Sequence, residues 1–237
     1  MRLLLTRPEP DTQRTAAALR TQGHDVIIAP LLRIVPIADA QIGEGPWAAI
    51  LITSVNAAHA IAAHARGAPL RALPVFAVGR RSADACRQAG FSDVIVAGGN
   101  VRDLIRLIVE RRADATGPLL YLAGEERSGD LAGELRAHGF VVETTMVYRA
   151  IAATGLPPAA ADALASGIDA VLHFSRRSAE AYVDAARAAG MATSALKPIH
   201  FGLSAQVAEP LAQAGAADIR VAERPNEALL LALIDAA

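Results

Sequence analysis

Small polar residues gather where predicted strands give way to predicted helices. They include Ser54, Gly79, residues 175–178 and Ser204, whereas residues 98–100 are interpreted as a turn and helix cap rather than a phosphate cradle. Turns of this kind leave backbone N–H groups facing the space beyond the strand ends, where ligands bind in open α/β sheets. The helix dipole adds about 0.3–1 kcal/mol of preference for an anion at each exposed terminus. These turns would therefore let a chain of nearly zero net charge bind a highly acidic small molecule through main-chain donors.

One tyrosine, Tyr148, lies in residues 139–151, the densest β-branched and aromatic run in an alanine-rich chain. Branched side chains lose least freedom in extended backbone, so the run predicts a strand. At about a dozen residues, it exceeds the usual strand of roughly 5–6. A strand that long after a helix is expected to finish one domain and cross to another, with the phenol beside a cleft. An ordinary long strand with a half-buried tyrosine is the alternative.

The composition excludes several classes of protein. The chain has 237 residues, of which 53% are hydrophobic, so it is too apolar for general disorder. No apolar run reaches the roughly 18 residues that a membrane span needs, and the three leucines after Arg2 are too few for a signal peptide. A single cysteine, Cys86, and a net charge of −1 favour a cytoplasmic protein that does not bind nucleic acid.

Motifs for cofactors, metals and covalent catalysis are missing from the sequence. No G-x-G-x-x-G follows a strand, and there is no P-loop and no G-x-S-x-G. His59 and His64 are spaced wrongly for a metal pair on a helix. His173, His200 and Cys86 are expected to be core residues, with both histidines hydrogen-bonded. An enzyme of this sequence is expected to work without metal, nucleotide or covalent nucleophile.

Apolar strands alternate with helices along the chain, which predicts parallel sheets covered on both faces. Two extended segments break the alternation: Leu31–Ile37, which no helix separates from the strand before it, and the run through Tyr148. Residues 124–128 are expected to form a polar loop, and Asn100 with Asp103 to form a helix cap. The predicted strands cover residues 3–6, 26–29, 31–37, 49–53, 75–78, 93–97, 119–123, 139–151, 170–174, 198–202 and 218–222.

The chain also contains an internal repeat. Residues 76–97 and 201–222 align at a constant offset, with shared Phe, Ala, Gln, Gly and Asp positions. A weaker match pairs residues 53–57 with 175–179. Two similar α/β lobes explain the repeat, and chance similarity between alanine-rich helices is the alternative. Two lobes would surround an acidic ligand with main-chain amides rather than lysines.

Several short motifs, in order, resemble those of the uroporphyrinogen-III synthase family over essentially the whole chain. They are LLTRP at 4–8, ITSVNA at 52–57, VGRRSA at 78–83, GEER at 124–127, VYR at 147–149 and PNEAL at 225–229. The resemblance implies an α/β fold of two flavodoxin-like lobes, each a parallel sheet flanked by helices, joined by a two-stranded connector. The first lobe would hold residues 1–33 and 150–237 and the second 36–147, with connectors near 31–37 and 146–151.

The family cyclises hydroxymethylbilane, a linear tetrapyrrole with acetate and propionate arms, with loss of water and inversion of the last pyrrole ring. The resemblance therefore implies a cofactor-free lyase whose substrate is a polycarboxylate, and we expect a cytoplasmic monomer. Tyr148 matches the family's cleft tyrosine, a candidate to act on the departing hydroxyl. The implied substrate-binding residues are Arg7, Thr53, Ser54, Asn56, Gly79, Ser82, Gly124, Arg127, Ser175, Arg176, Ser178 and Ser204.

Other roles remain open for these residues. The hydroxyl and amide side chains would also serve as helix caps, and Arg7 and Arg127 would also suit a solvated surface. The chain departs from the family at residues 202–205, where a Gly-x-Thr-Thr-Ala turn is common, and at the paired arginines of 175–178. The main alternative function is a cytosolic two-lobed binding or sensor protein without catalysis. A nucleotide-sugar transferase is weakened by the missing phosphate loop.

Overall fold

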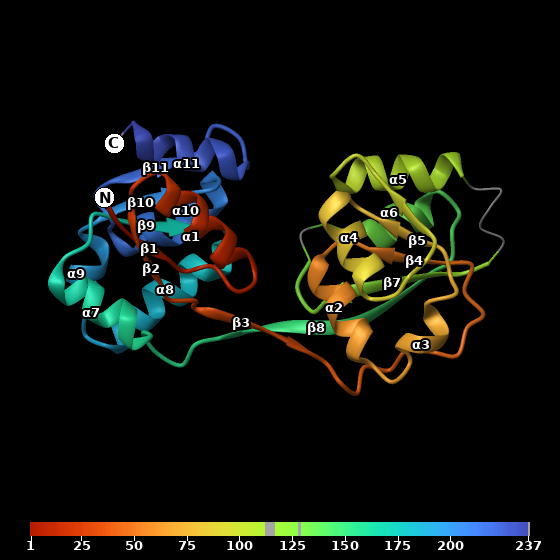
Figure 1. Cartoon of the computed structure of the whole chain (residues 1–237). Helices are drawn as coiled ribbons and strands as arrows, with labels where there is room; N and C mark the ends of the chain where they lie inside the picture. The colour runs from red at the N-terminus through yellow and green to blue at the C-terminus, as the bar shows by residue number, and fades with distance from the viewer. Residues whose placement is uncertain (112–116, 128, 237) are drawn as a thin grey trace. The chain divides into compact units, whose positions relative to one another are not determined.

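The structure is a computed structural model that describes residues 1–111, 117–127 and 129–236. Ser128, the last residue of the predicted polar loop, lies outside these ranges. The chain divides into two compact units, one of residues 1–33 and 151–237 and the other of residues 34–150. Each unit is built on its own open sheet of mainly parallel strands flanked by helices (Figure 1). The predicted α/β fold class is therefore confirmed.

The sheet of the first unit has the order β11-β10-β9-β1-β2, and all its strand pairs are parallel. Helices α7, α8, α9 and α10 pack on one face, and α1 and α11 on the other. The strands are β1 (Arg2–Leu5), β2 (Asp25–Ile28), β9 (Ala170–His173), β10 (Ile199–Gly202) and β11 (Ile219–Val221). The helices are α1 (Asp11–Thr21), α7 (Pro158–Ser166), α8 (Arg176–Ala188), α9 (Ala192–Leu196), α10 (Ala205–Ala214) and α11 (Glu227–Asp235).

The sheet of the second unit has the order β3-β8-β7-β4-β5-β6. Helices α2, α3 and α4 pack on one face, and α5 and α6 on the other. The strands are β3 (Leu32–Pro36), β4 (Ala49–Ile52), β5 (Val75–Ala77), β6 (Val94–Val96), β7 (Leu119–Gly124) and β8 (Val142–Ala152). The helices are α2 (Val55–Ala63), α3 (Gly67–Leu70), α4 (Arg80–Gln88), α5 (Val101–Glu110) and α6 (Leu131–Ala137).

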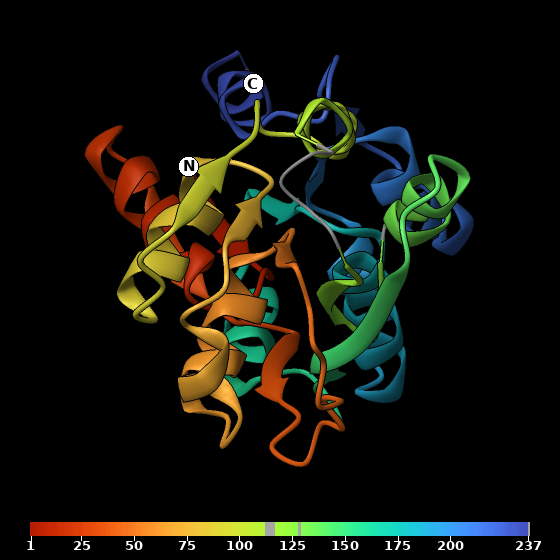
Figure 2. The same cartoon turned by 90° about the vertical axis from the view of Figure 1, so that its right-hand side faces the viewer.

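The chain passes between the two units twice, within β3 and within β8. The N–H of Ile37 donates to the carbonyl of Val147 at 2.8 Å, and that of Ala153 to Leu31 at 2.9 Å. Partner numbers rise in one segment as they fall in the other, so the two segments run antiparallel. Strand β8 is 11 residues long and is continuous in both views (Figure 1, Figure 2). The expected long strand through Tyr148 is therefore confirmed.

The internal repeat is visible in the elements. Helices α4 and α10 follow β5 and β10, and each is followed by a glycine in the left-handed region, Gly90 with φ 94° and Gly215 with φ 95°. Glycine is favoured there because it has no Cβ to clash with the preceding turn. The weaker match was out of register by one residue. Ser54 and Ser175 are the equivalent pair, since each is the N-cap of its helix.

His173 and His200 are fully buried in the first unit, as expected. Their Nε2 and Nδ1 atoms are hydrogen-bonded at 3.1 Å, and the ring of Tyr182 lies edge-on to both. The expectation of hydrogen-bonded core histidines is therefore confirmed, although the second ring nitrogens, His173 Nδ1 and His200 Nε2, are buried with no close hydrogen-bond partner among the described residues. Desolvation lowers the pKa of His200 to about 4 and that of His173 well below its usual value.

Candidate active site in the second unit

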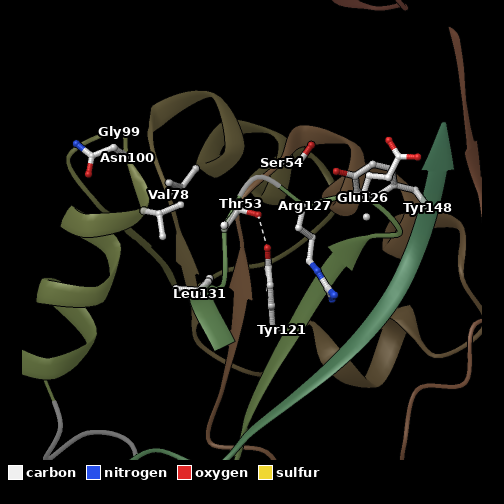
Figure 3. A pocket seen from close by; sticks show the side chains of 13 residues that line it. Thr53, Ser54, Val78, Gly99, Asn100, Tyr121, Glu126, Arg127, Leu131 and Tyr148 are labelled. Carbon is white, nitrogen blue, oxygen red and sulfur yellow. Dashed lines mark hydrogen bonds between the residues drawn. The ribbon is translucent and has the colours of Figure 1, made fainter. Parts of the chain in front are cut away.

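A cavity of about 440 Å³ lies at the carboxyl ends of the parallel strands of the second unit (Figure 3). The chain runs outward from β4 through β5 to β6 and then returns to β7 on the other side of β4. Loops after β4 and β7 therefore diverge, and such switch points are where open α/β sheets bind ligands. The cavity is lined by Thr53, Ser54, Val78, Gly99, Asn100, Val101, Tyr121, Gly124, Glu126, Arg127, Gly129, Leu131 and Tyr148.

A hydrogen bond bridges the switch point. The hydroxyls of Thr53, just after β4, and Tyr121, on β7, are 3.0 Å apart, and Figure 3 shows this bond at the base of the pocket. Tyr121 is buried, with only 5% of its surface exposed. Its ring packs among apolar residues of the α5 and α6 face, while its hydroxyl reaches the pocket. Sequence reasoning missed Tyr121, because a tyrosine inside an apolar strand gives the same signal as an ordinary core residue.

Tyr148 enters the pocket through an irregularity in β8. Ala123 lies opposite Met146, whereas the next residue, Gly124, lies opposite Tyr148, so β8 carries one extra residue. Bulges of this kind re-aim the side chains that follow them. Both Val147 and Tyr148 consequently pack against the apolar cluster on the α2 side of the sheet.

Gly124 leaves room for the phenol. A Cβ added at Gly124 would lie 2.6 Å from Cζ of Tyr148 and 2.8 Å from its hydroxyl oxygen. Real Cβ atoms do not approach other atoms so closely, so only glycine accommodates the ring in this position. This contact explains why the Gly124 of the predicted loop motif matters for the site.

The phenol of Tyr148 is held in its protonated form. Burial raises the pKa of Tyr148 above its usual value, and the neighbouring Tyr121 raises it further, whereas a hydrogen bond with the Ser54 side chain opposes the shift. Phenols are already protonated at neutral pH, with an ordinary pKa near 10. Tyr148 is therefore a hydrogen-bond donor in the lining of the pocket.

The turn before α5 also faces the cavity. Asn100 caps the helix by accepting from the N–H of Asp103 at 2.9 Å, which confirms the predicted cap. Gly99 has φ of 109°, and a Cβ at Gly79 would lie 3.1 Å from the Cα of Gly99. The two turns therefore approach each other closely, which only small residues allow. Gly79 itself does not line the cavity, but its missing side chain leaves room for Gly99, which does.

The charged residues of the pocket come from the loop after β7. Glu126 and Arg127 both line the cavity (Figure 3). Within residues 1–111, 117–127 and 129–236, no hydrogen bond or ion pair occupies the Arg127 guanidinium. An arginine in this state offers a planar set of donors to a carboxylate.

The cavity brings together five of the eight sequence-predicted residues of this unit: Thr53, Ser54, Gly124, Arg127 and Tyr148. The other three lie nearby in the helix starts. Asn56 donates its backbone N–H to the Ser54 hydroxyl at 3.2 Å, Gly79 precedes α4, and Ser82 is buried in α4. The lining residues that the sequence reasoning missed are Val78, Gly99, Asn100, Val101, Tyr121, Glu126, Gly129 and Leu131.

The candidate residues of the first unit lie after the carboxyl ends of its strands. Ser175 caps α8 by accepting from the N–H of Ser178 at 3.1 Å, and the Ser178 side chain is fully buried. Ser204 precedes α10 and makes no side-chain capping bond. Arg176 is about half exposed and pairs with Glu180 at 2.8 Å and with Glu209.

Arg7 is not a solvated surface arginine. Only 12% of its side chain is exposed, and it pairs with Asp11 at 2.9 Å and with Glu227 at 3.0 Å. Its guanidinium carbon lies 4.1 Å from the centre of the Phe174 ring. These contacts tie the loop after β1 to α1 and α11. A substrate carboxylate would therefore have to replace partners that the chain already supplies.

The described part of the chain contains no group of three or more His, Cys, Asp or Glu that would hold a metal ion. Within the same residues, no helix is both long and apolar enough to span a bilayer.

Comparison with known proteins assigns the family. The family model described as uroporphyrinogen-III synthase HemD matches residues 13–232. None of the curated proteins matches the sequence. Among solved structures, uroporphyrinogen-III synthetase from Helicobacter pylori 26695 aligns over 100% of this chain and 99% of its own, with a TM-score of 0.67 and 16% identity.

A mutant uroporphyrinogen III synthase from the extremely thermophilic bacterium Thermus thermophilus aligns over 100% of this chain and 98% of its own, with a TM-score of 0.53 and 15% identity. At these identities, the two structures support the fold alone, and the family model carries the assignment. Its match spans both units and most of the predicted motifs. The chain belongs to the uroporphyrinogen-III synthase family.

Proposed function

We propose that the chain is a lyase that closes hydroxymethylbilane into uroporphyrinogen III, with loss of water and inversion of the last pyrrole ring, and that it needs no cofactor. Family membership supports this reaction over binding without catalysis. The observation that carries the proposal is the protonated phenol of Tyr148, held against Gly124 in a polar pocket at the switch point.

The chemical problem is one of shape. The bilane closes without inversion when nothing guides it, so the protein must favour attack at the already substituted ring position. A hundredfold preference corresponds to only about 2.7 kcal/mol between the two transition states. Holding the reacting ends in one geometry supplies energies of this size without covalent chemistry. The amides and hydroxyls around the cavity are suited to that task.

Tyr148 is proposed as the catalytic residue. Its phenol would donate a hydrogen bond to the departing hydroxyl of the bilane, helping the C–O bond to break. A proton donor near a developing hydroxide stabilises the transition state more than the ground state. The partial burial of Tyr148 supports this role, because a hydrogen bond shielded from water is stronger.

We propose that substrate carboxylates are bound by both units. In the second unit the binding residues would be Thr53, Ser54, Asn56, Gly79, Ser82, Gly124 and Arg127. In the first unit they would be Arg7, Ser175, Arg176, Ser178 and Ser204. We further propose that residues 1–33 with 150–237 and residues 36–147 act as two domains, and that the protein is a cytoplasmic monomer.

The deciding experiment supplies freshly generated hydroxymethylbilane and resolves the oxidised products by isomer. We expect the inverted isomer in large excess over the isomer that forms spontaneously. A product mixture identical to the spontaneous one, from folded protein, would refute the proposal and favour a binding protein without catalysis.

A further inference from the structure

A second cavity of about 200 Å³ adjoins the pocket of the second unit. Tyr121 and Arg127 line both cavities, so the smaller cavity lies directly beside the larger one. It continues past Tyr121 to Thr144 and Arg136. One water takes up about 30 Å³ of liquid, so the cavity has room for a short carboxylate arm.

Thr144 gives this cavity an unused polar group. It lies directly opposite Tyr121 in the pairing of β7 with β8, so both side chains project from the same face of the sheet. The Thr144 hydroxyl oxygen is inaccessible to solvent and has no hydrogen-bond partner among the described residues. Leaving a buried hydroxyl unpaired costs about 1–3 kcal/mol. Because Thr144 lines the cavity, its hydroxyl is available to a polar group of a ligand that enters there.

The charge of the cavity is positive. The Arg127 side chain extends from its loop back toward β7 and β8 (Figure 3), and no described residue hydrogen-bonds or ion-pairs with it. Arg136 uses one N–H to donate to the carbonyl of Val142 at 2.7 Å, which leaves it further donors. The acidic lining residue is Asp130, whose Oδ1 accepts from the N–H of Gly133 at 2.9 Å in the cap of α6.

We propose that this side cavity is a subsite for one carboxylate arm of the substrate, with Arg127 as its ion-pairing residue and Thr144 as its hydroxyl donor. The inference rests on the proposed function, because it assigns an arm of that substrate. The arm enters past Tyr121 and orients the ring that bears it, so Arg127 and Thr144 are positioning residues rather than catalytic ones. An acetate and a propionate arm share this chemistry.

A binding experiment without turnover tests the subsite. Uroporphyrin III, which carries acetate and propionate arms, is titrated into wild type, Arg127→Gln, Thr144→Val and the control Arg106→Gln, with porphyrin fluorescence as the readout. Arg106 is an exposed α5 arginine that lines neither cavity, and its partner is Asp103. We expect Arg127→Gln to weaken binding about tenfold or more, and Arg106→Gln to leave it unchanged.

Thr144→Val provides a second signature. Valine keeps the shape of threonine but removes the orphan hydroxyl, so this variant should melt at a higher temperature while binding uroporphyrin III severalfold more weakly. A threonine with a purely structural role would not weaken binding when replaced. Steady-state kinetics with hydroxymethylbilane should place the effect of Arg127→Gln mainly on KM.

Coproporphyrin III, whose acetate arms are methyl groups, identifies the arm. Arg127→Gln weakens its binding if the arm is a propionate and spares it if the arm is an acetate. The proposal is overturned if wild type does not bind uroporphyrin III, or if Arg127→Gln and Thr144→Val both bind it as tightly as wild type. It is also overturned if Arg106→Gln loses as much affinity for uroporphyrin III as Arg127→Gln. Wild type that binds but makes no inverted isomer refutes the function and leaves the subsite standing.

Discussion

The phenol of Tyr148 and the phenol of Tyr121 share one pocket but have different surroundings. Tyr121 is buried and its hydroxyl is hydrogen-bonded to Thr53, whereas Tyr148 is half-buried in the second half of β8. The first arrangement fixes a wall of the pocket, and the second leaves a donor that a ligand can reach. The two tyrosines therefore serve as a matched pair for mutation.

Replacing Tyr148 by phenylalanine should lower kcat by about a hundredfold or more, because a positioned proton donor is lost. Stability should change by no more than about 1 kcal/mol, the usual worth of one hydrogen bond. Tyr121→Phe is the control, with a similar stability change and a much smaller loss of kcat. Wild-type turnover by Tyr148→Phe would remove Tyr148 from the reaction.

Gly124→Ala tests the contact that positions the phenol. The new methyl group would overlap the Tyr148 ring, so we expect a loss of about 1–3 kcal/mol in unfolding free energy and a clear fall in turnover. In a Tyr148→Ala background the same change should cost little stability, since the clash is gone. Gly117→Ala is the control, because its Cβ would meet Ala48 at an ordinary 3.5 Å. Additive stability effects of the Gly124 and Tyr148 changes would contradict the contact.

Strand β8 shows how an element sets the direction of a side chain. Up to Met146, its residues alternate in register with β7, and strict alternation would carry Tyr148 to the α5 and α6 face. The extra residue places Tyr148 opposite Gly124 on the other face, beside Val147. β8 thus has two roles, because it joins the units and its bulge turns the Tyr148 phenol toward the pocket.

Ser175 has two candidate roles, capping a helix and binding substrate, and replacing it by alanine and by asparagine distinguishes them. Ser175 caps α8, so Ser175→Ala should cost about 1 kcal/mol of unfolding free energy, and Ser175→Asn should retain most of it. If Ser175 only caps, turnover follows stability and Ser175→Asn is active. If its hydroxyl also binds substrate, as we propose, Ser175→Asn is folded but has a raised KM. Thermal melts and steady-state kinetics of the two variants separate these outcomes.

At the scale of the whole molecule, the buried histidine pair should make the first unit sensitive to acid. Both pKa values are lowered in the fold, that of His200 to about 4, against about 6.5 in an unfolded chain. Below about pH 6.5, the unfolded state therefore binds more protons than the folded state. The stability contributed by the neutral pair is complete above about pH 6.5 and falls as the pH drops toward 4, by up to about 1.4 kcal/mol per pH unit for each histidine.

Two signals distinguish the units in this measurement. Trp47, the one tryptophan, lies in the second unit, so its fluorescence reports on that unit, whereas circular dichroism reports on both. Acid should shift the circular dichroism transition more than the fluorescence transition. Replacing both histidines by leucine should flatten the dependence between pH 4 and 6.5. An unchanged pH profile in the double variant would show that other groups carry the acid sensitivity.

The sequence alone predicted much that depends on short range. Alternating apolar strands and helices established the α/β class, the length of the run through Tyr148 predicted β8, and Asn100 with Asp103 predicted a cap. These features follow from side-chain branching, periodicity and local hydrogen bonds, which neighbouring residues determine. Motif order likewise indicated the family that the family model then matched.

Only the tertiary structure decided what depends on strands meeting across the sheet. Several features have no local signal in the sequence. They are the short helices α3 and α9, the equivalence of Ser54 and Ser175 in the repeat, the Tyr121–Thr53 hydrogen bond and the unpartnered hydroxyl of Thr144. The bulge that turns Tyr148 belongs to the same class, because it exists only as a mismatch between β7 and β8. Residues distant along the chain determine these features together, since register and burial arise only when the strands pair.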